Sequence, residues 1–511
     1  MDASQRRFGA PRARVLARRV VTACAIAVVA GVAAQPARAA VPADAVGIYS
    51  EELERSNGAD PLAAAAVVRD ARAGLVRQPF SWKRIETSPG RLDFSVYDDV
   101  MAAAAAAGLS VLPVLMDPPD WRSTAPASGR LRAMYPPRAV ADMAVLAAAL
   151  VERYGPGGRF WTAHPELTPA PIHSWQVWNE PNITAFWATG PSPAAYTRLL
   201  EGVGSAIRAA DPGAEIVAAG LPLADNGIPI AQFLDGMYAA GARDAFDTLA
   251  IHPYASDAAG VLRILWAVRM QLDGLGDRDR RIWATEFGWS TGGPPVTITM
   301  SETSQAAVLR DTIDLMRRSR DALRLRGFVV FRYRDVLPNP GQTDVWALHA
   351  GLLRADGSAK PALGALRAAA GSWSDEPAPA QQISTPADLD AAAAAAAATA
   401  PGAGKPAPSI FGVRRRALRI RRFLQRGRLV VLVDVAPGGG GRRVRISLAA
   451  LRDGRVAVRV TRNVGSRGRV ARAVFRLGPR ARRAQLLRVS AAQGDVRATR
   501  TLRVHPSVHR L

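Results

Sequence analysis

Cysteine is almost absent from this chain of 511 residues, which contains only one, Cys24. A disulfide framework and paired-cysteine metal sites are therefore excluded. Histidine is also scarce: the six residues are scattered and include no His-Glu-x-x-His spacing. We expect neither a metal nor another cofactor. Lysine occurs only at Lys83, Lys360 and Lys405, so arginine carries nearly all of the positive charge.

The apolar stretch from Val20 to Ala34 is too short for a membrane span, because about 15 residues do not cross a bilayer. Six arginines precede it, and the small-residue site Ala37-Arg38-Ala39 follows it. This order is typical of an export signal. We expect residues 1–39 to be a secretory signal peptide, and the mature protein to be secreted or associated with the cell envelope, with no transmembrane segment.

Acidic residues are scarce only at the two ends of the chain. Residues 401–511 contain 28 Lys and Arg against three acids, and residues 1–39 have a net charge of +6. The remaining residues therefore have a net charge of −7 within a chain of net charge +24. No specific nucleic-acid partner is expected. The basic C-terminal part has two interpretations: it binds an anionic envelope polymer by releasing counterions, or it is a solvated arginine-rich surface.

Short apolar runs alternate with helical stretches between residues 40 and 372, which predicts a (β/α)8 TIM barrel, an α/β fold. The eight strands are expected to start near Val46, Leu75, Leu109, Ile172, Glu215, Thr248, Arg281 and Gly327. Helix candidates are Tyr97 to Gly108, Arg138 to Tyr154 and Ser192 to Ala210. Residues 373–408 are rich in Pro and Ala and predict a linker. Residues 409–511 alternate as strands do and predict a small, sandwich-like all-β domain.

Several polar side chains stand at the ends of the proposed strands: Arg77, Asp117, Asn179, Glu180, His252, Tyr254 and Glu286. In a TIM barrel, the C-terminal ends of the strands meet at one mouth. Glu180 and Glu286 would face each other there, although they lie far apart in the sequence. Two carboxylates about 5 to 5.5 Å apart are the groups that retaining glycoside hydrolysis requires. Asp117 is expected to shape its Pro-Pro loop.

The stretches "WQVWNEPN" and "ATEFGWS" resemble clan A glycoside hydrolases, with similarity to families 39 and 5. The similarity extends through "ERYGPGGRFW", "IRAADPGAEIVAAGL" and "LAIHPY". It implies a retaining enzyme that cleaves O-glycosidic bonds of β-linked oligo- or polysaccharides by double displacement. A carbohydrate is the implied partner.

The resemblance implies that Glu180 is the general acid/base and Glu286 the nucleophile. Physical reasoning agrees, because Arg77 and Tyr254 would favour the charged form of Glu286. The negative charge of Glu286, together with the apolar Trp175 and Trp178, would raise the pKa of Glu180. The resemblance also implies that Asn179 donates to the sugar 2-hydroxyl and that His252 supports the two carboxylates.

Four tryptophans on loops after strands are candidate sugar platforms: Trp121, Trp187, Trp289 and Trp346. We expect two of the four to contact substrate and include Trp289 and Trp346 among the site residues; the alternative is core packing. Clan members commonly carry a Trp at the end of strand eight, where this chain has "FVVFRYRD". Tyr333 or Trp346 is expected to replace it.

Two other classes of function compete. A non-catalytic carbohydrate-binding or adhesion protein on a barrel scaffold is one. The other is a serine hydrolase, because "GWSTG" places Ser290 in a Gly-x-Ser-x-Gly pattern. Such a nucleophile elbow leads directly into a helix, whereas Gly293-Pro294-Pro295 follows here and opposes one.

Overall fold

The computed structural model describes residues 44–54, 60–126, 134–224, 226–339, 342–375 and 377–399, and seven strands between residues 419 and 503. The predicted signal peptide and Cys24 lie outside the described residues. Within the described part of the chain, none of the helices combines the length and the hydropathy needed to cross a membrane.

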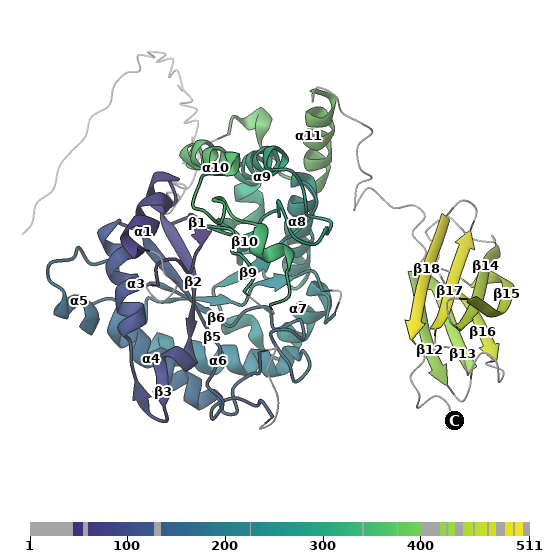
Figure 1. The fold of residues 1–511 in the computed structure, drawn as a ribbon, viewed down its shortest axis with the longest axis horizontal. Helices are drawn as coiled ribbons and strands as arrows, with labels where there is room; N and C mark the ends of the chain where they lie inside the picture. Colours follow the sequence, from purple (N-terminus) through teal and green to yellow (C-terminus); the bar gives the residue numbers. More distant parts are fainter. Residues whose placement is uncertain are drawn as a thin grey trace, which may run out of the picture. The chain divides into compact units, whose positions relative to one another are not determined.

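Eight parallel strands form a closed barrel in chain order (Figure 1). They are β1 (Val46–Tyr49), β2 (Leu75–Ser81), β5 (Ser110–Met116), β6 (Ser174–Val177), β7 (Glu215–Ala218), β9 (Thr248–His252), β10 (Arg281–Phe287) and β11 (Leu325–Val330). The ring closes because β11 pairs with both β10 and β1. The predicted TIM barrel is confirmed, and every strand begins within two residues of its expected start.

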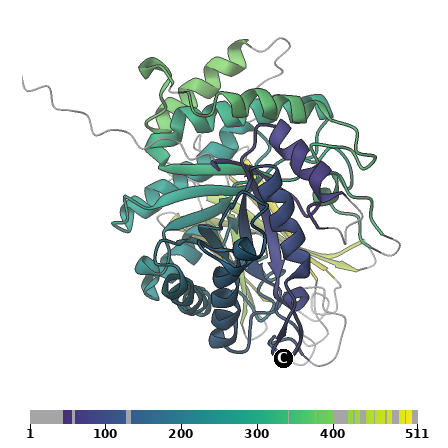
Figure 2. The ribbon, with the colours of Figure 1, turned by 90° about the vertical axis from the view of Figure 1, so that its left-hand side faces the viewer.

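Helices surround these strands in two perpendicular views (Figures 1 and 2). They are α1 (Pro61–Asp70), α2 (Trp82–Ile85), α3 (Ser95–Ala106), α4 (Val140–Tyr154), α5 (Arg159–Ala163), α6 (Pro193–Ala210), α7 (Ile230–Ala239), α8 (Ala258–Gly274), α9 (Glu302–Leu323) and α10 (Pro361–Gly371). Short elements lie between them: β3 (Glu86–Ser88), β4 (Arg91–Leu92), β8 (Leu221–Pro222) and the 3-10 turns η2 (Ala242–Asp244) and η3 (Trp346–His349).

Local sequence explains why α6 begins where it does. The Ser192 hydroxyl accepts a hydrogen bond from the Ala195 N–H at 3.3 Å, and Pro193 occupies the first turn. Both features favour a helix start. The apolar side chains then recur every three or four residues, so that one face is buried: Tyr196, Leu199, Leu200, Val203 and Ile207.

The barrel interior is packed with side chains from most of the strands, so it is a core and not a channel. One cluster of fully buried residues combines six strands: Leu75, Leu112, Val217, Ala250, Trp283 and Val329. Because helices cover the outer face as well, the strands are buried on both sides, which accounts for their continuous apolar runs. The closed core leaves the ends of the strands as the places where polar side chains gather.

Part of the predicted linker is folded against the barrel. Helix α11 (Pro386–Thr399) contacts α8, where Arg263 Nη2 lies 2.7 Å from Asp390 Oδ1. Ile383 and Leu389 are buried, as is Trp373. The composition suggested a linker because Ala and Pro dominate it, but three large apolar side chains are enough to anchor the segment.

The C-terminal strands pair in an antiparallel manner, in the order β12-β13-β16-β15-β14-β17-β18. Their bounds are Arg419–Gln425, Arg428–Asp434, Arg443–Arg452, Arg455–Arg467, Val470–Arg476, Leu486–Gln493 and Val496–Arg503 for β12 to β18. A sandwich of two packed layers stays a prediction for this region.

Candidate active site

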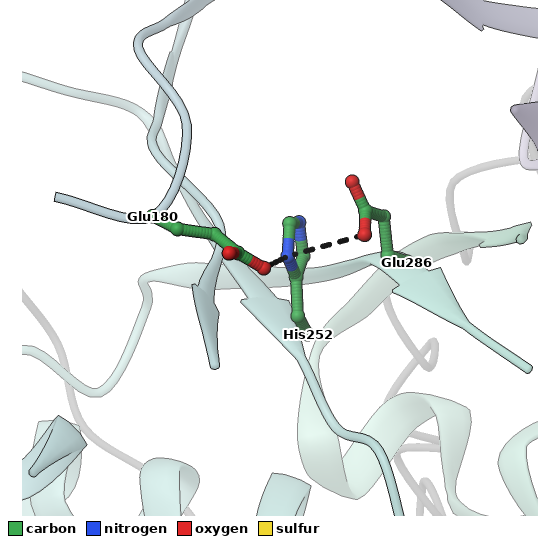
Figure 3. A group of neighbouring side chains, drawn as sticks. All are labelled: Glu180, His252 and Glu286. Carbon is green, nitrogen blue, oxygen red and sulfur yellow. Dashed lines mark hydrogen bonds and ion pairs between the residues drawn. The ribbon is translucent and has the colours of Figure 1, made fainter. Parts of the chain in front are cut away.

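Polar side chains from β2, β6, β9 and β10 converge at the C-terminal end of the barrel. Glu180 follows β6 and Glu286 lies near the end of β10, while His252 closes β9 and stands between the two carboxylates (Figure 3). Oxygen atoms of Glu180 and Glu286 and a ring nitrogen of His252 all lie within 4.8 Å of one another. The structure thus brings together the two glutamates that the sequence singled out.

Two donors hold the carboxylate of Glu286. Arg77 Nη1 donates to Glu286 Oε1 at 2.6 Å, and the Tyr254 hydroxyl donates to Oε2 at 2.9 Å. Burial alone would raise the pKa of Glu286, but the charges of His252 and Arg77 and the hydrogen bonds from Arg77 and Tyr254 outweigh it and lower the pKa. Glu286 is therefore ionised at neutral pH.

All three nitrogen atoms of the Arg77 guanidinium donate hydrogen bonds. Besides Glu286, its Nε donates to Gln176 Oε1 at 2.8 Å and its Nη2 donates to Asn179 Oδ1 at 2.9 Å. Arg77 is only 1% exposed, so this charge acts where water screens it little. Because Asn179 accepts through Oδ1, its amide N–H groups remain available as donors.

Glu180 sits on an unusual backbone. Its φ is +46° and that of Trp178 is +72°, a region that residues other than glycine seldom adopt. The Glu180 N–H donates to the Gly220 carbonyl at 3.2 Å, which holds this turn in place. Burial raises the pKa of Glu180 and the nearby charge of Glu286 adds to the effect, against the opposing contact with His252. The two glutamates therefore have pKa shifts of opposite direction.

His252 positions Glu180 directly. Its Nδ1 lies 2.7 Å from Glu180 Oε1 and 3.5 Å from Glu286 Oε2. Its Nε2 has no hydrogen-bond partner among the described residues and faces Gly220, where an added Cβ would lie 2.0 Å from that nitrogen. Sequence reasoning missed both Gly220 and Gln176; a polar Gln inside the buried "WQVW" run was the available signal for the latter.

Glu180, His252 and Glu286 also satisfy the spacing of a metal site. A cation placed there would lie beside the Arg77 guanidinium, which already contacts Glu286, and would be repelled by its charge. The donor set therefore fits acid/base chemistry better than cation binding.

Aromatic side chains lie beside the carboxylate pair. The ring centroid of Trp346 is 5.0 Å from that of Tyr254 and 6.0 Å from that of Phe331. Trp346 thus stands next to Tyr254, which donates to Glu286, and near Phe331, which directly follows β11. Its role as a replacement for the strand-eight tryptophan stays a prediction. Tyr333, the other replacement considered, is buried.

The remaining tryptophans divide by exposure. Trp289 is 1% exposed, and its indole N–H donates to the Ala255 carbonyl at 2.8 Å, so it packs inside the protein. This corrects the expectation that Trp289 offers a face to substrate. Trp187 is also buried, between Trp178 and Tyr196. Trp121, in contrast, is 41% exposed on the loop after β5.

Asp117 and Ser290, the other two residues singled out in the sequence, form hydrogen bonds within the protein. Asp117 accepts a hydrogen bond from the Ser81 hydroxyl at 2.7 Å and pairs with Lys83 at 2.9 Å, which fits its expected role in shaping a loop. Ser290 is buried and its hydroxyl donates to the Gly292 carbonyl at 2.6 Å. No helix begins before Glu302 in that stretch, so the serine does not sit on a nucleophile elbow.

Comparison with known proteins finds no matching family model and no matching curated protein. Solved structures do match. A variant of the family 5 glycoside hydrolase GH5_18 from Streptomyces cattleya, in complex with Manb1-4GlcNAc, is 16% identical with a TM-score of 0.50, over 65% of this chain and 81% of that chain.

Two further structures cover more of the chain at slightly lower TM-scores. A family 39 glycoside hydrolase from Bacteroides cellulosilyticus WH2 is 18% identical with a TM-score of 0.48, over 85% of this chain and 79% of that one. A glucosidase from Croceicoccus marinus is 15% identical with a TM-score of 0.48, over 86% of this chain and 94% of that one. The match to GH5_18 indicates that the chain shares the barrel fold of that protein.

Proposed function

We propose that this protein is a retaining glycosidase that cleaves β-linked oligo- or polysaccharides, with Glu180 as acid/base and Glu286 as nucleophile. One observation carries the proposal: two buried carboxyl groups lie within 4.8 Å and have pKa shifts of opposite direction. A short separation of this kind leaves no room for a water between the carboxylate and the sugar, which favours retention over inversion.

The reaction has two displacements. In the first, the Glu180 carboxyl donates its proton to the glycosidic oxygen, that C–O bond breaks, and a Glu286 oxygen forms an ester bond with the anomeric carbon. In the second, Glu180 takes a proton from water, the water oxygen bonds to the anomeric carbon, and Glu286 leaves as a carboxylate. Glu180 ends protonated, so both groups return to their starting states.

Neighbouring groups have matching roles in this scheme. The amide group of Asn179, whose oxygen accepts from Arg77, offers its N–H to the sugar 2-hydroxyl, a contact that strengthens as positive charge develops on the ring. Arg77 and Tyr254 keep Glu286 ionised before attack. Trp346 is placed to pack against a sugar face beside Tyr254.

A non-catalytic carbohydrate-binding protein is the second candidate, because the same mouth would bind sugars without cleaving them. A binding scaffold has no need of two carboxyl groups with opposed pKa shifts, which favours the enzyme. Hydrolysis of any aryl glycoside discriminates between the two.

The decisive experiment is to incubate the purified protein with a panel of aryl β-glycosides and polysaccharides and to follow product anomers by NMR. The β anomer is expected to appear first and then to mutarotate. Initial release of the α anomer would contradict the double displacement, and absence of hydrolysis on the whole panel would contradict the glycosidase proposal.

We also propose that the protein acts outside the cytoplasm, after export directed by residues 1–39, and that its basic C-terminal strands attach to an anionic polymer. The sequence order of basic, apolar and small residues supports export. The net charge of residues 401–511 supports attachment, and retention on an anionic polymer should then weaken as salt rises. Retention that is insensitive to salt would contradict the electrostatic attachment.

A further inference from the structure

Arg332 lies at the barrel mouth, two residues after the end of β11. Its backbone is held on both sides by the segment that follows η3. The Arg332 N–H donates to the Ala350 carbonyl at 3.0 Å, and the Leu352 N–H donates to the Arg332 carbonyl at 2.9 Å. Trp346 lies in η3, directly before this segment, so the Arg332 backbone is fixed close to the aromatic side chains of the site.

The guanidinium of Arg332 rests against two aromatic rings. Its central carbon lies 6.0 Å from the ring centre of Tyr49 and 5.7 Å from that of Phe331. Tyr49 is shared, because the guanidinium of Arg77 lies 5.8 Å from the same ring. One ring therefore connects Arg332 with the arginine that holds Glu286.

The two guanidiniums differ in their partners. Arg77 contacts a carboxylate at 2.6 Å, and Arg334, two residues beyond Arg332, contacts Glu52 at 2.5 Å. For Arg332, the described residues provide no hydrogen bond from the guanidinium and no ion pair. Its side chain is half-buried against Tyr49 and Phe331, so its donors are oriented without an internal anion.

An oriented arginine fork with no internal anion is suited to a carboxylate on a ligand, since planar guanidinium and carboxylate groups form paired hydrogen bonds. We infer that Arg332 selects sugars that carry a carboxylate, so that the preferred substrates of this site are β-linked glycosides containing a uronic acid unit. This inference rests on the proposed function and narrows it. Tyr49 and Phe331 would hold the fork in place while its outer N–H groups reach the acid.

The test compares two substrates that differ only at C6, 4-nitrophenyl β-D-glucuronide and 4-nitrophenyl β-D-glucoside. The wild-type protein is expected to have the higher kcat/KM for the glucuronide. In Arg332→Gln, the ratio of the two kcat/KM values should fall about ten- to hundredfold, mainly through KM for the glucuronide, because one charge-assisted contact is lost. In Arg332→Lys, this ratio should fall less, since the positive charge stays but the planar guanidinium is lost.

Arg198→Gln is the matched control. Arg198 is exposed on α6 and, within the described chain, has no ion pair, so its replacement removes the same charge away from the mouth. The substrate ratio of this control should match that of wild type. A ratio in Arg332→Gln within threefold of wild type would overturn the inference while leaving the glycosidase proposal standing.

A binding measurement separates the two proposals if neither aryl glycoside is cleaved. Calorimetry with methyl β-D-glucuronide and methyl β-D-glucoside, on the wild-type chain and on Arg332→Gln, then decides. Tighter glucuronide binding that depends on Arg332 supports the inference and counts against the glycosidase. Equal binding of both sugars, or no binding, overturns the inference.

Discussion

Each end of the barrel has a largely enclosed glutamate, Glu215 at the N-terminal end and Glu180 at the mouth, and the two differ in how many hydrogen-bond and ion-pair partners the carboxyl group has. At the N-terminal end, Glu215 accepts hydrogen bonds from the Ser174 hydroxyl at 2.7 Å, the Thr248 hydroxyl at 2.5 Å and Arg281 at 2.8 Å. Arg326 lies 3.5 Å from it as well. At the mouth, His252 is the one hydrogen-bond partner of the Glu180 carboxyl group among the described residues.

This difference separates an anchor from a reactive group. The Glu215 carboxylate, with four partners, connects strands β6, β7, β9, β10 and β11. The Glu180 carboxyl group, buried with one hydrogen-bond partner among the described residues, has a raised pKa, which favours the protonated form that an acid catalyst needs. The structural position of Glu215 and the position proposed for the acid Glu180 match the general division of TIM barrels, in which the N-terminal face serves stability and the C-terminal face carries the reactive groups.

The largest effect on turnover is expected from Glu286→Ala. Loss of the nucleophile should lower kcat at least about 10⁴-fold, because no ester can form. Added azide should restore part of the rate by attacking from the vacated face, and the glycosyl azide should have the anomeric configuration opposite to the substrate. NMR of the product identifies it.

Glu215→Gln is the corresponding change at the other barrel end. It should lower the free energy of unfolding and leave the kcat of the folded protein within about twofold of wild type.

A folded Glu286→Ala variant that azide does not rescue would contradict the assigned nucleophile.

Glu180→Gln should lower kcat/KM about 10²- to 10⁴-fold for substrates with poor leaving groups and much less for dinitrophenyl glycosides. The wild-type profile should be bell-shaped. Activity falls as pH drops through the lowered pKa of Glu286, which becomes protonated, and falls as pH rises through the raised pKa of Glu180, which loses its proton. The alkaline limb should vanish in Glu180→Gln, and an equal loss on all leaving groups would refute its role as acid.

Gly220→Ala tests the contact beneath His252. The new Cβ would lie 2.0 Å from Nε2, so the ring must move away from Glu180 and kcat should fall roughly 10²-fold. Because the His252 contact lowers the pKa of Glu180, its loss should also move the alkaline limb to higher pH. A pH profile measured on the variant checks this.

Gly364→Ala is the matched control for that change, since nothing lies within 4 Å of its added Cβ on α10. It should keep wild-type activity and slightly raise stability. An unshifted alkaline limb in Gly220→Ala would show that His252 does not tune Glu180.

Arg326→Met should change turnover least. Arg326 lies 2.7 Å from Asp44 and 3.5 Å from Glu215, and its guanidinium lies 4.3 Å from the centre of the Trp283 ring. Its replacement removes this partner from both acids. The free energy of unfolding should fall by about 3 kcal/mol, with kcat/KM within about twofold of wild type. Denaturant titration and kinetics on the same sample measure both.

Arg281→Gln removes a half-exposed guanidinium from Glu215 and should cost less than about 1 kcal/mol. If Arg326→Met lowered kcat/KM as much as Gly220→Ala does, the N-terminal end of the barrel would be coupled to the active site.

Much of the site was predictable because its signals are local. The strand runs, the Asn179-Glu180-Pro181 turn and the second glutamate of β10 are all readable within a few residues. The same reasoning failed for Trp289, because the exposure of a loop side chain depends on which distant segment covers it. Helix α11 was missed for a similar reason: it contacts α8 from far along the chain, as in the pair of Asp390 with Arg263.

The sequence by itself determined the eight-strand barrel and the pair of glutamates, since strand periodicity and strand ends are properties of short segments. Only the tertiary structure decided that, within the described chain, Glu286 has two donors while Glu180 has one and Arg332 has no carboxylate partner. It also decided that Trp346 stands beside Tyr254 while Trp289 is buried. Hydrogen-bond partners and burial are set by residues that fold together from distant parts of the chain, and no local pattern encodes them.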